Sequence, residues 1–172
     1  MPCKLLLDYL DRMQADYQLH RHATAYTAQE VAHTCHIQGR SLAKAVMVKL
    51  GHELAMVVIP AHYHVQVELL AHSLGVRSVA LATEREFARH FPRCELGAIP
   101  PFGHLYGVRT FLIPSFDDQS PLAFNAGSHD SLLVMSYHKY WQLAGATAIF
   151  QGAAPIGWLA THQTPSRANI VM

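Results

Sequence analysis

The chain has 172 residues, of which 51% are apolar, and a formal net charge of +1. This length supports one buried core and is too short for two ordinary domains. The near-neutral charge argues against a broad electrostatic surface for nonspecific nucleic-acid binding. The longest apolar runs are far shorter than a membrane-spanning helix requires, so we expect no membrane association.

The cysteines and histidines indicate neither a disulfide framework nor a metal site. Cys3, Cys35 and Cys94 are odd in number and widely spaced, which favours a reducing compartment; we expect a cytoplasmic protein without a signal peptide. His33 and His36 flank Cys35 at a spacing that could chelate a metal. No further carboxylate or cysteine pattern completes such a site, so we expect no metal and no cofactor.

The N-terminal third predicts two helices around a short extended piece. Leu6 and Leu10 recur at helical spacing, and a capping box of Thr27 and Glu30 opens a second helix. The expected elements are a helix over 4–16, an extended piece over 17–22 and a helix over 27–36.

The middle of the chain predicts a hairpin followed by alternating helices and strands. Gly51 and His52 separate two alternating apolar runs, Gly75 suits a left-handed helix C-cap, and Thr83 with Glu86 forms a second capping box. The expected elements are strands over 43–50 and 54–60, a helix over 65–74, a strand over 77–81, and a helix from 84 that ends at Pro92.

The C-terminal part predicts further strands and one helix. Extended runs cover 108–113, 122–126, 131–135 and 147–151, with a helix over 136–144. The fold class is therefore α/β (α+β), with a mixed, mostly antiparallel central sheet surrounded by helices. We expect one domain over 1–152 and an appendage over 153–172 that is not a domain, with Trp158 and Leu159 as its candidate docking residues.

Lys44 stands in an otherwise apolar strand, on the same parity as Val46 and Val48. A buried ammonium without a partner is destabilising, so such a lysine normally meets an anion or a cluster of acceptors. The alternative is a lysine at a strand end whose ammonium extends to water.

The stretch "GAIPPFG", residues 97–103, is stiff, bare and apolar. Proline fixes φ and glycine lets another molecule approach the main chain, so the stretch suits a rigid backbone wall beside a ligand. A tight turn between two elements is the alternative.

The stretch "FNAGSHD" collects polar side chains between two apolar strands. Asn125, Gly127, Ser128 and His129 could form a rim for a small polar ligand, or only a hairpin turn. Ser128 and His129 are adjacent on an extended chain and point in opposite directions, so a serine–histidine nucleophile pair is not expected.

Taken in order, six fragments resemble the YbaK and prolyl-tRNA-synthetase-associated editing domain family. The resemblance covers about residues 21–144 and rests on "HATAYTAQEVA", "SLAKAVMVK", "AMVVIPAHY", "LGVRSVALATEREF", "GAIPPFG" and "FNAGSHDSLLVMS". It implies a YbaK-like fold and a metal-independent hydrolase that acts in trans on mischarged tRNA. The bond cleaved would be the ester between the tRNA and a small amino acid (Ala, Cys or Ser), with proline tRNA as the expected carrier.

The resemblance also assigns roles to residues. Lys44 matches the essential lysine of the family, Gly97 and Pro101 match its G-x-x-x-P motif, and His129 lies where some members position the amino acid. These four are the expected catalytic residues. The expected substrate-binding residues are Ile99, Pro100, Phe102, Gly103, Asn125, Gly127 and Ser128.

This sequence departs from common members at the tRNA-binding surface. Gln66 and Glu68 stand where basic residues often occur, and Arg85, Arg89 and Arg93 offer only a local phosphate-binding edge. The expected partners are mischarged tRNA and an aminoacyl-tRNA synthetase; the sequence does not indicate the oligomeric state. Two alternatives stay open, a non-catalytic tRNA- or synthetase-binding module on the same fold and a histidine-based metal protein.

Overall fold

The computed structural model describes residues 1–157. Its helices are α1 (Lys4–Arg12), α2 (Ala28–Thr34), α3 (Val67–Leu74), α4 (Glu84–Phe87) and α5 (Tyr137–Leu143), with short 3-10 helices η1 (Gly39–Ser41), η2 (Ala88–His90) and η3 (Gly103–Tyr106). Its strands are β1 (Tyr17–Arg21), β2 (Leu42–Leu50), β3 (Glu53–Pro60), β4 (Tyr63–Val65), β5 (Val79–Leu81), β6 (Arg109–Leu112), β7 (Pro121–Asn125), β8 (Ser131–Ser136), β9 (Thr147–Ala148) and β10 (Ala153–Pro155).

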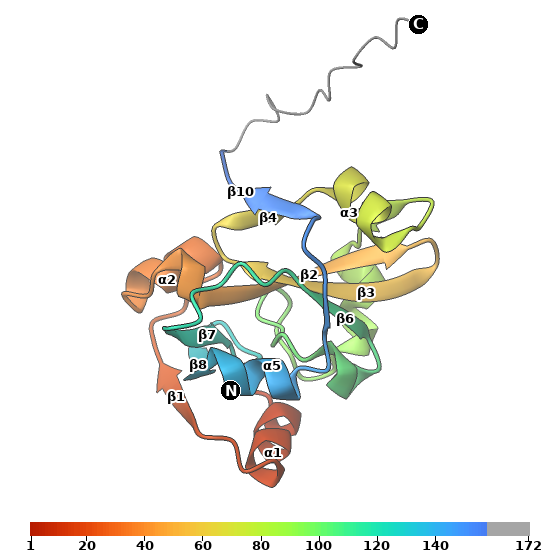
Figure 1. The fold of residues 1–172 in the computed structure, drawn as a ribbon. Helices are drawn as coiled ribbons and strands as arrows, with labels where there is room; N and C mark the ends of the chain where they lie inside the picture. The colour runs from red at the N-terminus through yellow and green to blue at the C-terminus, as the bar shows by residue number, and fades with distance from the viewer. Residues whose placement is uncertain (158–172) are drawn as a thin grey trace, which may run out of the picture.

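One mixed sheet organises the molecule (Figure 1). Seven strands follow the order β1-β8-β7-β2-β3-β6-β9, and β5 is an eighth strand that also pairs with β2. The β1–β8, β7–β8, β2–β3 and β2–β5 pairs are antiparallel, whereas β2–β7, β3–β6 and β6–β9 are parallel. The predicted mixed, mostly antiparallel sheet is confirmed.

Apolar side chains fill both faces of this sheet. Figure 1 shows α1 and α5 on one side of the β2–β3 hairpin and α3 with the β4–β10 ribbon on the other. The first core contains Leu6, Phe102 and Tyr140; the second contains Val48 and Leu70. A third cluster lies under α2 and joins Val31 to Leu42, Ala123 and Leu132.

Local signals in the sequence account for the starts of α2 and α4 and for the end of α3. The Thr27 hydroxyl accepts a hydrogen bond from the Glu30 amide, and the Glu30 carboxylate accepts one from the Thr27 amide, both at 3.1 Å. The same box forms at Thr83 and Glu86. Gly75 ends α3 with a φ of +64°, as a left-handed C-cap requires.

Several boundaries differ from the sequence-based prediction. The helix expected over 65–74 begins at Val67, and the strand expected over 147–151 ends at Ala148. Helix α1 ends at Arg12 and not at Asp16, because Gln14 adopts a left-handed φ of +50° and the Ala15 amide bonds back to the Leu10 carbonyl. Residues 153–155, expected in the appendage, form β10 and pair with β4. Trp158 and Leu159, the proposed docking residues, lie outside the described residues.

Candidate functional site

The sheet divides at the middle of β2. Strand β3 pairs along one edge of β2 from Ala43 to Leu50. The other edge is shared, with β7 beside Leu42 and Ala43 and β5 beside Val48 to Leu50. Among residues 1–157, the stretch from 44 to 47 has no strand partner on that edge, although the Met47 carbonyl accepts a hydrogen bond from the Ala82 amide at 2.9 Å. Ligands of α/β proteins often bind where neighbouring strands diverge in this way.

Lys44 lies at this division. Alternation along β2 places its side chain on the face of Val46 and Val48, as the sequence predicted, and the side chain is half-buried. Within residues 1–157 no hydrogen bond or ion pair reaches the ammonium, and burial lowers the pKa of Lys44 below its ordinary value. An unpartnered, partly desolvated cation is suited to bind an anion or a carbonyl oxygen.

Asn125 follows Phe124, the last residue of β7 that pairs with β2. Because Ala43 pairs with Phe124, the next residues along the two strands are Lys44 and Asn125, on the same face. The Asn125 Oδ1 atom is buried and has no hydrogen-bond partner in the described structure. Two polar groups without partners thus lie at the carboxyl end of β7, where a bound ligand could satisfy them.

The turn after β7 contacts the loop that contains Gly97. The Glu95 amide donates to the Gly127 carbonyl at 2.8 Å, and the Gly127 amide donates to the Ala98 carbonyl at 3.0 Å. The structure therefore brings together two of the segments that the sequence singled out, although they are about 30 residues apart.

His129 is held tightly between these segments. Its backbone amide donates to the Glu95 carboxylate at 2.7 Å, Nε2 lies 2.9 Å from the Leu96 carbonyl oxygen, and Nδ1 lies 3.2 Å from that of Ala25. Both ring nitrogens therefore contact backbone oxygens. This geometry suits a positioning residue better than a general base, which needs a free nitrogen.

Gly97 fits closely beside this histidine. It is exposed with a φ of +87°, and a Cβ atom built on it would lie 3.2 Å from the His129 Cε1 atom. Both the backbone conformation and the close approach require glycine here.

The rest of the loop faces the core. Ile99, Pro100, Pro101, Phe102 and Gly103 are buried. The Pro101 carbonyl accepts a hydrogen bond from the Tyr140 hydroxyl at 3.0 Å. The Phe102 and Tyr140 rings pack edge to face, with 5.3 Å between their centroids. These side chains anchor the loop, so direct substrate contact remains a prediction that their burial does not favour.

Ser128 is likewise buried, and its hydroxyl is occupied locally. It donates to the Asp130 carboxylate at 2.7 Å and contacts the Ser131 hydroxyl. The Ser128 hydrogen bond is the main reason why the pKa of Asp130 lies below its ordinary value, and Arg21 also pairs with that carboxylate at 3.3 Å. Ser128 therefore fixes the turn.

Two residues that the sequence-based site did not include also lie here. The His22 amide donates to the Asp130 carbonyl at 3.0 Å, and the His22 Nε2 atom is buried with no hydrogen-bond partner in the part of the chain that the structure describes. The exposed Tyr26 ring lies 4.8 Å from the His129 ring. No sequence motif marks either role, because both depend on contacts across more than 100 residues.

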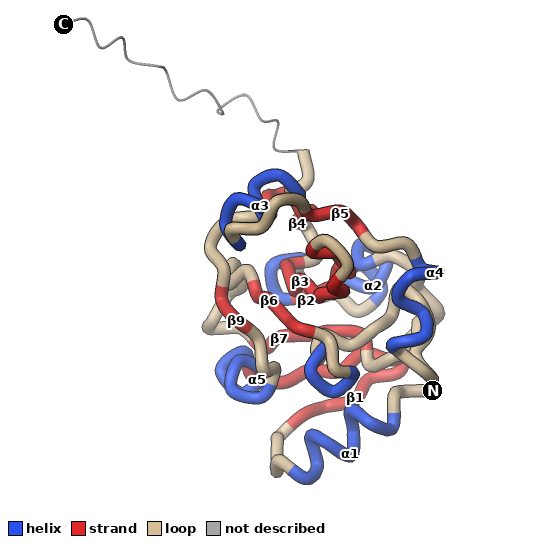
Figure 2. The backbone as a smooth tube through the Cα atoms, turned by 90° about the vertical axis from the view of Figure 1, so that its right-hand side faces the viewer, coloured by secondary structure: helices blue, strands red, loops and turns tan. Residues whose placement is uncertain are grey.

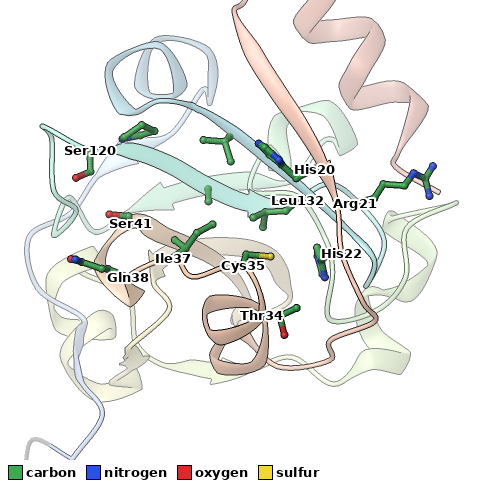
Figure 3. Close-up of a pocket in the computed structure, with 13 residues that line it drawn as sticks. His20, Arg21, His22, Thr34, Cys35, Ile37, Gln38, Ser41, Ser120 and Leu132 are labelled. Atoms are coloured by element: carbon green, nitrogen blue, oxygen red, sulfur yellow. The ribbon is translucent and has the colours of Figure 1, made fainter.

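Two hollows flank the segment from His22 to Tyr26. The smaller one, about 350 Å³, is lined by Thr24, Tyr26, Glu95, His129 and Asp130. The larger one, about 530 Å³, lies between α2 with η1 and the strands β1, β7 and β8 (Figure 3). Its lining includes His20, His22, Cys35, Gln38, Ala123 and Leu132.

The larger hollow opens on the sheet face of Asn125, because Ala123 and Leu132 flank that residue within β7 and β8. Among residues 1–157, no group of three or more histidine, cysteine or acidic side chains could hold a metal ion. The same residues include no helix that is long and apolar enough to cross a membrane.

Among residues 1–157, the split sheet leaves the Lys44 ammonium and the Asn125 amide oxygen without partners in an α/β domain. Two solved structures share this fold over nearly their whole length. A hypothetical protein is 16% identical with a TM-score of 0.74, covering 84% of this chain and 97% of its own. A candidate trans-editing enzyme for prolyl-tRNA synthetase is 15% identical with a TM-score of 0.74, covering 87% and 95%.

A candidate signal transduction protein from Marinobacter aquaeolei VT8 is 18% identical with a TM-score of 0.64, and there the match covers 86% of this chain but 30% of the longer one. No curated protein matches the sequence. The model of the aminoacyl-tRNA editing domain family matches residues 22–143. The chain belongs to this family, which supports a general role in editing aminoacyl-tRNA.

Proposed function

We propose that the protein is a deacylase that hydrolyses the ester of a small amino acid, Ala, Cys or Ser, mischarged on tRNA, with proline tRNA as the carrier. The observation that carries the proposal is that, within residues 1–157 of an editing-family fold, the Lys44 ammonium and the Asn125 amide oxygen both lack partners and lie one residue beyond the same strand pair. A cation and an acceptor on the same face of neighbouring strands can orient the ester and the amino group of an aminoacyl end.

The reaction requires little from the protein beyond orienting the ester and the attacking water. An aminoacyl ester is activated, so a positioned water and donors at the developing oxyanion supply most of the required stabilisation. Lys44 would stabilise negative charge at the ester, and the exposed backbone of Gly97 would form one wall. His129 would hold that wall in position. In this scheme the neighbouring ribose hydroxyl assists the attacking water, and no metal takes part.

A separate editing site is needed because the binding energies that distinguish similar amino acids are small. A charging pocket separates amino acids that differ by one methylene by only about 1–3 kcal/mol. A second site that admits only the smaller, wrongly attached amino acids removes the remaining errors. The anchored, proline-containing loop suits this steric exclusion because its core contacts limit its movement.

We further propose that the larger hollow receives the nucleotide end of the substrate. It opens on the sheet face of Asn125 and is lined by His20, Arg21 and His22, which are able to contact phosphate and ribose. The unpartnered His22 Nε2 atom is one group that such a ligand would satisfy.

The test is a panel of matched and mischarged tRNAs. Wild-type protein should release Ala, Cys or Ser from at least one mischarged tRNA and spare the matched one, with a chelator making no difference. Lys44→Ala should lower kcat/KM by about 100-fold or more. Lys49→Ala is the matched control, because Lys49 lies on the same strand but pairs with Glu86.

Failure of the wild-type protein to deacylate any member of the panel would contradict the enzyme assignment. Retained tRNA or synthetase binding without turnover would instead identify a binding module on this fold.

A further inference from the structure

Cys3 and Cys94 meet in the structure although 90 residues separate them. Cys3 is the N-cap residue of α1, and Cys94 precedes the Glu95–Gly97 segment of the candidate site. The Tyr106 hydroxyl contacts both sulfur atoms, at 2.9 Å from the Cys3 Sγ and 3.2 Å from the Cys94 Sγ. In Figure 2 the N-terminus and α4 lie on the same side of the molecule.

The surroundings of the two thiols shift their pKa values in opposite directions. A hydrogen bond with Cys94 is the main cause that lowers the pKa of Cys3 to about 5, with a smaller contribution from Tyr106 and with burial acting in the opposite direction. The hydrogen bond with Cys3 and burial raise the pKa of Cys94. A thiolate at a helix N-terminus beside a second thiol is the arrangement found in reactive cysteine pairs.

We propose that Cys3 and Cys94 are a redox pair that forms a reversible intramolecular disulfide when the protein meets a small peroxide. Cys3 is only 3% exposed, whereas Cys94 is partly exposed, so a small oxidant has access from the Cys94 side. Cys35, the third cysteine, lines the larger hollow and takes no part.

The chemistry balances with hydrogen peroxide as the oxidant. The Cys3 thiolate attacks one peroxide oxygen, the O–O bond breaks, and the departing hydroxide takes up a proton to leave as water. The sulfenic acid on Cys3 is then attacked by the Cys94 sulfur, so that an S–S bond forms and a second water leaves. Two thiols are oxidised and one peroxide is reduced, and a thiol reductant reverses the change.

The pair is coupled to the turn that carries His129. The Cys3 amide donates to the Ala126 carbonyl at 2.6 Å, and a Cβ atom at Gly127 would lie 2.7 Å from the Cys3 Cβ atom. The residue after Cys94 holds the same turn through the Glu95–Gly127 hydrogen bond. A disulfide would therefore tie the N-terminal arm to the candidate-site loop.

The test needs no tRNA, so its outcome is independent of the proposed function. Full-length Cys35→Ser protein is treated with hydrogen peroxide, its free thiols are counted, and its peptides are examined by mass spectrometry without reduction. We expect loss of both thiols, a Cys3–Cys94 cross-linked peptide in monomeric protein, a raised Tm and full reversal by a thiol reductant. Tyr106→Phe, which removes the shared hydroxyl, should slow the oxidation several-fold.

Cys3→Ser and Cys94→Ser, each in the Cys35→Ser background and checked for native circular dichroism, should form no intramolecular cross-link. Three results would each overturn the proposal: two free thiols that survive peroxide in folded protein, sulfinic acid without a cross-link, or cross-links only between chains.

Discussion

Lys44 is held where burial disfavours its charge, and no residue of the described fold pairs with it. Residues that lower stability in this way occur at functional sites, where activity requires them. We expect Lys44→Met, which keeps the length of the side chain, to raise the Tm at pH 7 by about 2 °C, within the range for a gain below 1 kcal/mol in a domain of this size. The same variant should lose deacylation. Thermal denaturation and the tRNA assay measure the two effects.

The pH dependence of the Tm difference between Lys44→Met and the wild-type protein follows from the direction in which folding shifts the pKa of Lys44. Because the pKa of Lys44 is lower in the folded chain than in the unfolded chain, folding is disfavoured while the lysine is charged. This penalty is fully present below the folded pKa and disappears as pH rises through it toward the unfolded value. The Tm advantage of Lys44→Met should therefore shrink between pH 7 and pH 10. A Tm advantage of Lys44→Met that grows from pH 7 to pH 10 would contradict a lowered pKa of Lys44 in the folded chain.

A second prediction concerns Gly97, and Gly51 serves as its control. Gly97→Ala places a methyl group at a φ of +87° and crowds the His129 ring, whereas Gly51→Ala imposes similar backbone strain at +64° with no atom within 4 Å of the new carbon. Both should lower stability by about 1 kcal/mol. Only Gly97→Ala should also reduce deacylation, by about tenfold or more, because His129 must move. Equal activities of the two variants would remove Gly97 from the site.

At the scale of elements, signals within about ten residues allowed correct predictions. The capping boxes at Thr27 and Thr83, the turn at Gly51 and the C-cap at Gly75 each depend on neighbours in the chain, and each forms as expected. The end of α1 was wrong because the apolar spacing continues through Met13, which is 42% exposed, while Gln14 has already left the helix.

Contacts between distant elements could not be read from the sequence. Nothing in β5 or β7 alone shows that the two strands share one edge of β2, yet this sharing leaves Lys44 at the start of the stretch that neither strand pairs with. The same limit explains why the sequence indicated no disulfide, since the approach of Cys3 to Cys94 depends on where α1 packs. The resemblance to the editing family gave Lys44, Gly97 and His129 as candidate residues, whereas His22 and Tyr26 became candidates only from the fold.

At the scale of the whole molecule, hydrogen bonds join three distant parts of the chain at the candidate site: the segment after β1, the loop at Gly97 and the turn after β7. Lys44 lies one residue beyond the β2–β7 pair that precedes this turn. No single element contains the candidate site. The larger hollow adds α2 and η1 to this assembly (Figure 3). The aminoacyl and nucleotide ends of one substrate could therefore occupy neighbouring parts of the same surface.

Gln38 tests whether the larger hollow takes part. It is exposed and lines the hollow, and its Oε1 atom accepts a hydrogen bond from the Arg40 side chain at 2.7 Å. Gln38→Trp should partly fill the hollow without disturbing the core. We expect KM for mischarged tRNA to rise about tenfold, with little change for a small aminoacyl ester that lacks the nucleotide.

Gln29→Trp is the matched control, because Gln29 is exposed on α2 and does not line the hollow. It should leave both substrates unaffected, since a surface tryptophan away from the site obstructs nothing. If Gln38→Trp leaves KM for tRNA unchanged while Lys44→Ala abolishes turnover, the nucleotide end must approach Lys44 by another route. The smaller hollow beside His129 would then be the route to examine, through Thr24→Trp.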